Sequence, residues 1–189
     1  MTKRLLIAAS LLACLSLPST AFGHPATTAD QKNAAKHCKD MRGSTDASRE
    51  AFATQWGTNK NRSNAFGKCV SSHAKEEHAE RHAAKSNASR DCRAERKQNG
   101  QAQFRADHGT NKNKSNAFGK CVSKKAKQKK AAMDRSDRQK NTAFKNAAAA
   151  CDAQRGSTTE SRTAFEAQWG TNSNKSNAFG KCVSAGARA

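Results

Sequence analysis

The chain has 189 residues and a formal net charge of +20 at neutral pH. Beyond residue 23 it contains no Leu, Ile or Tyr, and Val and Phe together contribute only 10 of the remaining 166 residues. A sequence so poor in large apolar side chains does not bury a large core. This composition excludes doubly wound sheets, TIM barrels, β-sandwiches and most enzyme scaffolds.

Residues 1–23 have the organisation of a bacterial signal peptide. Lys3 and Arg4 precede an apolar run at 5–17, and the small residues Ala21 and Gly23 lie at positions −3 and −1 of a predicted cleavage site. The run is too short for a comfortable transmembrane helix, and no other apolar stretch follows it. We therefore predict export, to a secreted or cell-envelope location, of a chain without a transmembrane segment.

Cleavage removes one cysteine, Cys14, whose surroundings weakly resemble a lipoprotein box. Apolar residues continue beyond Cys14, which favours simple secretion, although lipidation stays open. Six cysteines remain in the mature chain, and an even number in an exported protein predicts disulfides. Loss of Lys3 and Arg4 lowers the net charge from +20 to +18.

Internal repetition is the strongest pattern in the sequence. Residues 57–71 are GTNKNRSNAFGKCVS, residues 109–123 are GTNKNKSNAFGKCVS, and residues 170–184 are GTNSNKSNAFGKCVS. Each block has one further cysteine upstream. One disulfide per repeat is the simplest connectivity, and it predicts the pairs Cys38–Cys69, Cys92–Cys121 and Cys151–Cys182.

Each repeat predicts two or three short helices. The first carries the upstream cysteine and ends near Gly43 or Gly156, where glycine suits a left-handed C′ position. In the third repeat, Ser157 and Glu160 have the spacing of a capping box for the second helix. In the first repeat the matching cap is Ser44 or Thr45.

A glycine, Gly57 in the first repeat, is expected to end the second helix. The Asn-rich stretch after it is a predicted loop, and Ser63 or Asn64 is the predicted cap of the third helix. Gly67 within that helix is expected to allow close approach of a neighbouring helix. The predicted apolar clusters are Phe52, Trp56, Phe66 and Val70; Phe104, Phe118 and Val122; and Phe165, Trp169, Phe179 and Val183.

The connecting segments are rich in Ala, Lys, Arg, Glu and Gln and contain neither Gly nor Pro, which favours helix. We predict an all-α protein of three small, disulfide-stapled helical repeat units joined by charged linkers, either solvated helical rods or partly disordered segments. The predicted organisation is a signal peptide at 1–23, an N-terminal tail at 24–30, repeat unit 1 at 31–71, a linker at 72–91, a degenerate repeat unit 2 at 92–123, a basic linker at 124–150, repeat unit 3 at 151–184 and a C-terminal tail at 185–189.

The densest basic run lies in the second linker. On a helix it would surround most of the circumference and give salt-dependent, sequence-independent affinity for polyanions. The alternative interpretation is a solvated linker that has no binding role and whose charge keeps the chain soluble. The candidate polyanion-binding residues are Lys124, Lys125, Lys127, Lys129, Lys130, Arg135 and Arg138.

The loop of each repeat offers a second candidate surface, because three copies present the same amide and Lys groups and would gain from avidity. A calcium loop is disfavoured, because calcium prefers carboxylates. A purely structural loop is the favoured interpretation. The candidate residues are Asn59, Asn61, Asn64, Lys68, Asn111, Asn113, Asn116, Lys120, Asn172, Asn174, Asn177 and Lys181.

His78 and His82 have the i, i+4 spacing that holds zinc or copper on a helix. They lack the Glu that directly follows the first His of a zincin motif, so a solvated helix is the favoured interpretation. No catalytic motif is present. We predict a non-enzymatic protein without a metal, cofactor or small-molecule substrate; the oligomeric state stays open.

The GTNKNKSNAFGKCVS block with its paired upstream cysteine resembles exported proteins of actinobacterial type that are uncharacterised. The resemblance covers the three units and implies a bacterial, exported setting but no activity. The favoured function is electrostatic, multivalent binding of an anionic polymer: nucleic acid, an anionic cell-wall polymer or an acidic polysaccharide. The alternative is a structural spacer or protein-interaction module of the cell envelope.

Overall fold

A computed structural model describes residues 25–188, and all regular secondary structure over these residues is helical. The predicted signal peptide lies outside the described residues. The helices are α1 (Thr28–Arg42), α2 (Asp46–Trp56), α3 (Ala65–Asn99), α4 (Gln101–His108), α5 (Ala117–Arg155), α6 (Thr159–Trp169) and α7 (Ala178–Gly186). No helix in this part of the chain is long and apolar enough to cross a membrane.

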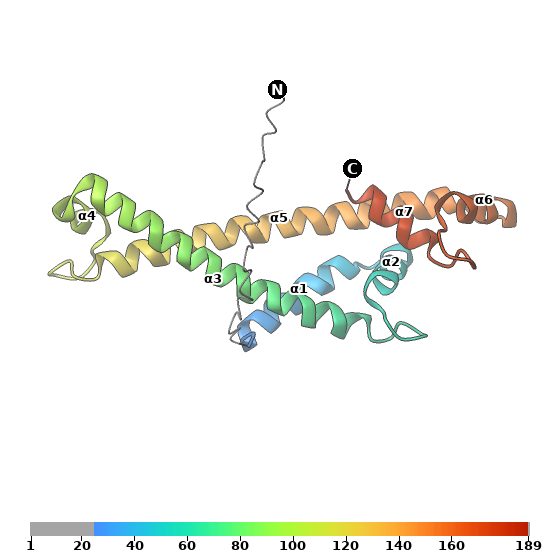
Figure 1. Ribbon diagram of the computed structural model, residues 1–189, viewed down its shortest axis with the longest axis horizontal. Helices are drawn as coiled ribbons and strands as arrows, with labels where there is room; N and C mark the ends of the chain where they lie inside the picture. The colour runs from blue at the N-terminus through green and yellow to red at the C-terminus, as the bar shows by residue number, and fades with distance from the viewer. Residues whose placement is uncertain (1–24, 189) are drawn as a thin grey trace, which may run out of the picture.

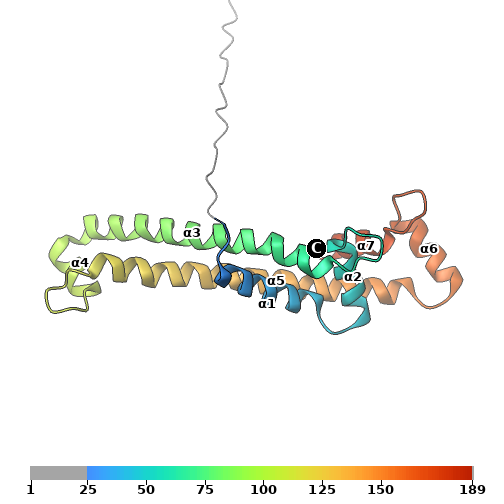
Figure 2. The same cartoon turned by 90° about the horizontal axis from the view of Figure 1, so that it is seen from below.

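Two long helices, α3 and α5, run side by side in opposite directions along much of the molecule (Figures 1 and 2). At one end they are joined by α4 and the loop that follows it. We call this end, residues 90–130, the distal end. The short helices α2, α6 and α7 gather at the opposite end, and α1 packs against both long helices between the ends.

Both linkers are helical. Residues 72–91 lie within α3 and residues 124–150 lie within α5, so the last helix of one repeat continues into the first helix of the next. Their Ala-, Lys- and Glu-rich composition favours this continuity. The two linkers are not separate solvated rods, however, because they pack against each other over much of their length.

The three disulfides pair as predicted, Cys38–Cys69, Cys92–Cys121 and Cys151–Cys182. Each joins two helices whose Cα atoms at the cysteines are 6.0 or 6.1 Å apart. All six of these cysteines are 0–3% exposed and lie among buried Ala, Phe and Val side chains, so disulfide sulfur forms part of the apolar interior.

The buried apolar side chains form two clusters, and the larger one spans the first and third repeats. Phe52 and Cys69 of the first repeat pack in one core with Phe165, Phe179 and Val183 of the third. The smaller cluster lies at the distal end around Phe104, Cys92 and Cys121. The separate apolar clusters predicted for the first and third repeats are therefore one cluster, because α3 and α5 run antiparallel and bring these repeats to the same end of the molecule.

Two aromatic side chains differ from the predicted clusters. Phe66 is 37% exposed and lies beneath Arg42 instead of in the core. Phe144, which the sequence analysis assigns to a linker, is 7% exposed and belongs to the shared core. A linker residue becomes a core residue here because the linker helix lies beneath the junction of the two repeats.

The predicted glycine at the end of the first helix is confirmed. Gly43 and Gly156 have positive φ values of 61° and 64° and cap α1 and α5. Gly57 ends α2 as expected, but with a negative φ. It is required there for space, since a Cβ would lie 2.4 Å from that of Arg62.

The helix starts differ from the prediction by one residue in the third repeat. Thr158, not Ser157, caps α6, and its Oγ1 accepts from the Ser161 amide. Thr45 caps α2 in the same way. Asn64 is the N-cap residue of α3, but its side chain is turned back into the preceding loop. The strongest cap was missed: Thr27 and Asp30 form a capping box at the start of α1.

Candidate functional site

The predicted basic run lies on α5, where it faces α3 on one side and solvent on the other. Lys124 and Lys127 are exposed and make no ion pair within the described residues. Lys125 Nζ, in contrast, lies 2.7 Å from a carboxylate oxygen of Glu95, and Lys129 Nζ lies 2.9 Å from Asp91. The run is therefore not a cationic surface around the whole circumference, because α3 neutralises one face of it.

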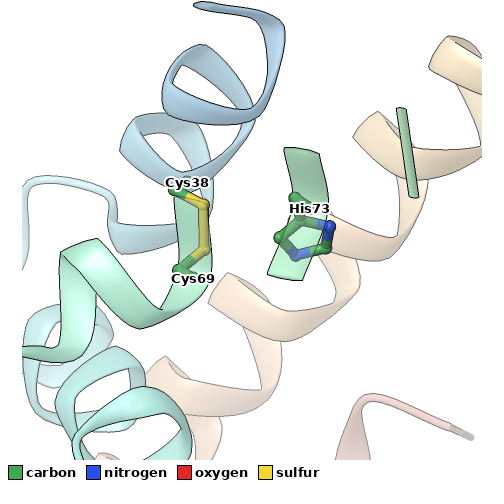
Figure 3. Close-up of side chains that lie close together, drawn as sticks. All are labelled: Cys38, Cys69 and His73. Atoms are coloured by element: carbon green, nitrogen blue, oxygen red, sulfur yellow. A yellow bond between two sulfur atoms is a disulfide. The ribbon is translucent and has the colours of Figure 1, made fainter. Parts of the chain in front are cut away.

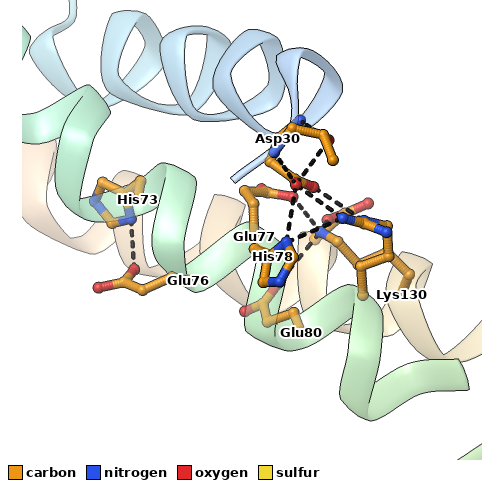
Figure 4. A network of polar contacts seen from close by, with 10 residues as sticks. Asp30, His73, Glu76, Glu77, His78, Glu80 and Lys130 are labelled. Carbon is orange, nitrogen blue, oxygen red and sulfur yellow. Dashed lines mark hydrogen bonds and ion pairs between the residues drawn. The ribbon is translucent and has the colours of Figure 1, made fainter. Parts of the chain in front are cut away.

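Lys130 is the most enclosed lysine of the run. Its Nζ lies 2.8 Å from Glu77 Oε2 and 3.2 Å from Glu80 Oε2, and it also pairs with Asp134 one turn later on α5 (Figure 4). Burial lowers the pKa of Lys130, but its hydrogen bonds to the three carboxylates outweigh burial and raise the pKa overall. Lys130 is thus a charged structural contact between the long helices.

The remaining predicted residues of the run, Arg135 and Arg138, are exposed but lie outside the distal end. Arg138 borders a cavity of about 450 Å³ between α1, α3 and α5. Glu77, Glu80 and Asp134 also have the mutual spacing of a metal-binding group. The ammonium group of Lys130 already provides the positive charge among those three carboxylates.

His78 and His82 lie on α3 with ring centroids 4.5 Å apart. His78 Nδ1 is 3.4 Å from Asp30 Oδ2 and 3.1 Å from Arg81 Nη2 (Figure 4). Arg81 in turn donates to both carboxylate oxygens of Asp30. His78 therefore belongs to a polar contact that fixes the start of α1 on the middle of α3.

A third histidine of the same helix, His73, lies beside the Cys38–Cys69 disulfide (Figure 3). These three residues have metal-binding spacing, but both sulfur atoms are in the disulfide. His73 packs against the rings of His37 and Trp56, at centroid distances of 4.1 and 5.2 Å. Burial and the neighbouring His73 lower the pKa of His37.

The three Asn-rich loops share one hydrogen-bond network. In the first loop Asn64 Oδ1 accepts from the Thr58 amide at 3.0 Å, and Asn64 Nδ2 donates to Thr58 Oγ1 at 2.8 Å. Asn59 Nδ2 donates to Ser63 Oγ, and Asn61 Oδ1 accepts from the Ser63 amide. The same bonds recur in the other loops at Asn111, Asn113 and Asn116 and at Asn172, Asn174 and Asn177.

These amide side chains hold the loop together, which supports the structural interpretation of the motif. The fifth residue after each loop glycine has a positive φ of 55–56°, at Arg62, Lys114 and Lys175. The loop lysines after the network differ from the amides. Lys68, Lys120 and Lys181 are all exposed, and only Lys120 lies in the distal end.

The structure adds basic residues that sequence reasoning missed, because they come from segments other than the dense run. Residues 90–130 contain thirteen Lys and Arg but only three Asp and Glu, which gives +10 of the mature net charge of +18. Ten of the thirteen are exposed and make no ion pair within the described residues. They are Arg90, Arg93, Arg96, Lys97, Arg105, Lys112, Lys114, Lys120, Lys124 and Lys127.

A repeated Arg–Phe contact was also missed. The Arg four residues after the first cysteine of each unit lies over the Phe three residues before the second. The distances from guanidinium carbon to ring centroid are 5.7 Å for Arg42 and Phe66, 5.6 Å for Arg96 and Phe118, and 4.5 Å for Arg155 and Phe179. The sequence signal for this contact is the constant spacing of the Arg and the Phe from the two cysteines of each unit.

Comparison with known proteins adds no family to these observations. No protein-family model, no curated protein and no solved structure matches the chain.

Proposed function

We propose that the protein is an exported, basic, non-enzymatic protein that attaches to anionic polymers through its distal end. The observation that carries this proposal is the concentration of ten exposed Lys and Arg side chains at one end of an elongated molecule. Such a surface attracts phosphate, sulfate or carboxylate groups along a polymer chain and releases their counterions. Three disulfides and the signal-peptide pattern support an oxidising, extracytoplasmic setting.

The surface favours polymers over a compact anionic ligand. Its cations come from three helices and a loop and are therefore spread over an extended surface. The aromatic residue among them, Phe118, is half-buried beneath Arg93 and Arg96 and is not free to stack on a base. Stacking platforms are what single-strand readers add to basic grooves. The distal end therefore supports charge-dominated, sequence-independent binding.

One observation favours a second candidate, the spacer. Helices of 35 and 39 residues pack as one antiparallel pair and separate the two ends of the molecule. At 1.5 Å per residue each helix spans about 50–60 Å. In this alternative the length of the pair sets a distance between partners, and charge only confers solubility.

Two variants of equal charge test the proposal. In the first, Lys97, Lys112, Lys120, Lys124 and Lys127 of the distal end are changed to Gln. In the second, Lys32, Lys39, Lys60, Lys68 and Lys75, which are also exposed and make no ion pair in the described part of the chain, are changed to Gln. Both variants lower the mature net charge from +18 to +13, and Lys and Gln have similar helix propensities.

Binding of each oxidised chain to double-stranded DNA, heparin and a teichoic acid is measured across a salt series. We expect the distal variant to lose at least tenfold in affinity and to show a shallower salt dependence, since fewer phosphates are neutralised. The second variant should lose much less. Equal losses would reject the distal end as the site, and absence of binding by the parent chain at physiological salt would favour the spacer.

A further inference from the structure

A second candidate site lies at the end of the molecule opposite the basic surface. A cleft of about 640 Å³ opens between α2, α5, α6 and α7. Thr54 and Gln55 line it from the first repeat, while Gln168, Trp169 and Ser184 line it from the third. The cleft exists only because these two repeats share one core, and its volume falls within the usual range for small-ligand sites.

The lining is mostly uncharged and rich in hydrogen-bonding groups. It contains no Asp or Glu, and its two charged side chains, Lys181 and Arg188, are cationic. Gln55 and Ser184 make no side-chain hydrogen bond among the described residues, and Gln168 uses only its Oε1, which accepts from Gln154. Amide and hydroxyl groups both donate and accept, so the cleft presents unused groups of both kinds.

Of the two aromatic residues that line the cleft, Phe144 and Trp169, Trp169 has a copy in the first repeat, Trp56, and differs from it. Trp56 Nε1 donates to the sulfur of Met41 at 3.3 Å. The residue matching Met41 in the third repeat is Gln154, and its amide is turned to Gln168. Trp169 Nε1 consequently has no hydrogen-bond partner within the described residues, and the half-buried indole borders the cleft.

We infer that this cleft binds a short, uncharged oligosaccharide. A sugar ring offers hydroxyl groups that both donate and accept, which suits the unused groups of Gln55, Gln168 and Ser184. Its C–H faces suit the indole of Trp169, which is half-buried, whereas the other large apolar side chains of the lining, Phe144 and Val183, are buried in the core. Cationic ligands are disfavoured because the lining has positive charge and no carboxylate. This site is independent of the polyanion surface, so the molecule would hold a glycan at one end and a polyanion at the other.

The test uses the full oxidised mature chain in about 0.5 M salt, where long-range attraction to charged polymers is screened. Chitotetraose, cellotetraose and maltotetraose are titrated up to the millimolar range by calorimetry and by Trp fluorescence. We expect saturable binding of at least one of them. Each of Gln55→Ala and Ser184→Ala should weaken it about fivefold, the loss typical of one hydrogen bond.

Ser71 and Ser123 are the copies of Ser184 in the other repeats, and neither lines the cleft. Ser71→Ala and Ser123→Ala are therefore matched controls that should leave binding unchanged. Absence of saturable binding to all three tetrasaccharides would overturn the inference. Equal effects of Ser184→Ala and Ser71→Ala would also overturn it, as would binding that disappears in high salt. Loss of the basic surface would leave this result unaffected, so the two proposals fail separately.

Discussion

Lys130 Nζ on α5 lies 2.8 Å from Glu77 Oε2 on α3, and this contact joins the two long helices of the molecule. Side-chain exposures of 19% for Lys130 and 11% for Glu77 make it one of the more enclosed ion pairs. Removing one partner leaves the other charge without compensation. We expect Lys130→Met to lower the free energy of unfolding by about 2–3 kcal/mol, less than for completely buried pairs. Urea unfolding measures this change.

Lys127→Met is the matched control, because Lys127 is an exposed neighbour with no ion pair in the described residues. It should change stability by less than about 0.5 kcal/mol. The double variant Glu77→Gln, Lys130→Met should recover part of the loss through pairwise coupling. Equal effects of the two lysine substitutions would show that α3 does not neutralise this face of α5.

Gly67, Gly119 and Gly180 occupy the same position in the three repeats, and substituting each of them tests the contact between the first and third repeats. A Cβ on Gly180 would lie 2.6 Å from Thr54 Cγ2 of α2, while Gly67 and Gly119 have no atom within 4 Å. We expect Gly180→Ala to destabilise the protein by about 1–3 kcal/mol through overpacking. Gly67→Ala and Gly119→Ala should stabilise it by about 0.5–1 kcal/mol, because Ala favours helix. Equal changes in thermal stability for the three variants would contradict the packing of α7 against α2.

Asp30 makes stability depend on acid pH. Hydrogen bonds from Arg81 lower its pKa most, and the bonds from Thr27 add to this, while burial opposes it. A carboxyl whose folded pKa is depressed stabilises the fold above its unfolded pKa of about 3.9. That stabilisation is lost as the pH falls through this value toward the folded pKa.

We therefore expect Asp30→Asn to lower stability at neutral pH and to flatten the loss of stability below about pH 4. Urea unfolding at a series of pH values measures both effects. Asp46→Asn, at an exposed position in the first turn of α2, is the control and should leave the acid limb steep. If the free energy of unfolding of Asp30→Asn still decreases below about pH 4 as steeply as that of the parent chain, protonation of Asp30 does not account for the loss of stability in acid.

Composition and spacing predict the helix content and the disulfide pairing, and composition favours helical linkers while leaving partly disordered ones open. The packing of the first repeat against the third could not be predicted from the sequence, because three near-identical copies give no preference for one partner over another. It follows from the antiparallel packing of α3 and α5, whose contacts, such as the ion pair of Lys129 with Asp91, join residues that are distant in sequence. The burial of Phe144 has the same origin.

The candidate sites show the same division. Lys124 and Lys127 are found by scanning for a dense basic run, whereas Arg93 and Arg105 join them only when α3 and α4 fold beside α5. Sequence repetition identifies the loop Asn residues, but their hydrogen bonds within the loop follow only from the loop geometry. The cleft opposite the distal end lies between two repeats, so no local sequence pattern marks it.

The distal end depends on its disulfide more than the opposite end does. Its cluster has six buried apolar residues, including Cys92 and Cys121, while the shared core has sixteen. A disulfide closing a loop of this length contributes about 3–4 kcal/mol. We expect the Cys92→Ala, Cys121→Ala variant to open residues 92–121 locally, with rapid amide hydrogen exchange there and continued protection of the shared core. Uniform loss of protection would contradict two separable cores.

The central claim is that the charge available to a polyanion lies at the distal end. Lysine acetylation of the oxidised mature chain, with and without heparin, locates that contact directly when modified peptides are quantified by mass spectrometry. We predict that heparin protects Lys112, Lys120, Lys124 and Lys127 several-fold, while Lys32, Lys39, Lys60 and Lys68 stay reactive. Equal protection of both groups, or protection confined to the second, would contradict the account.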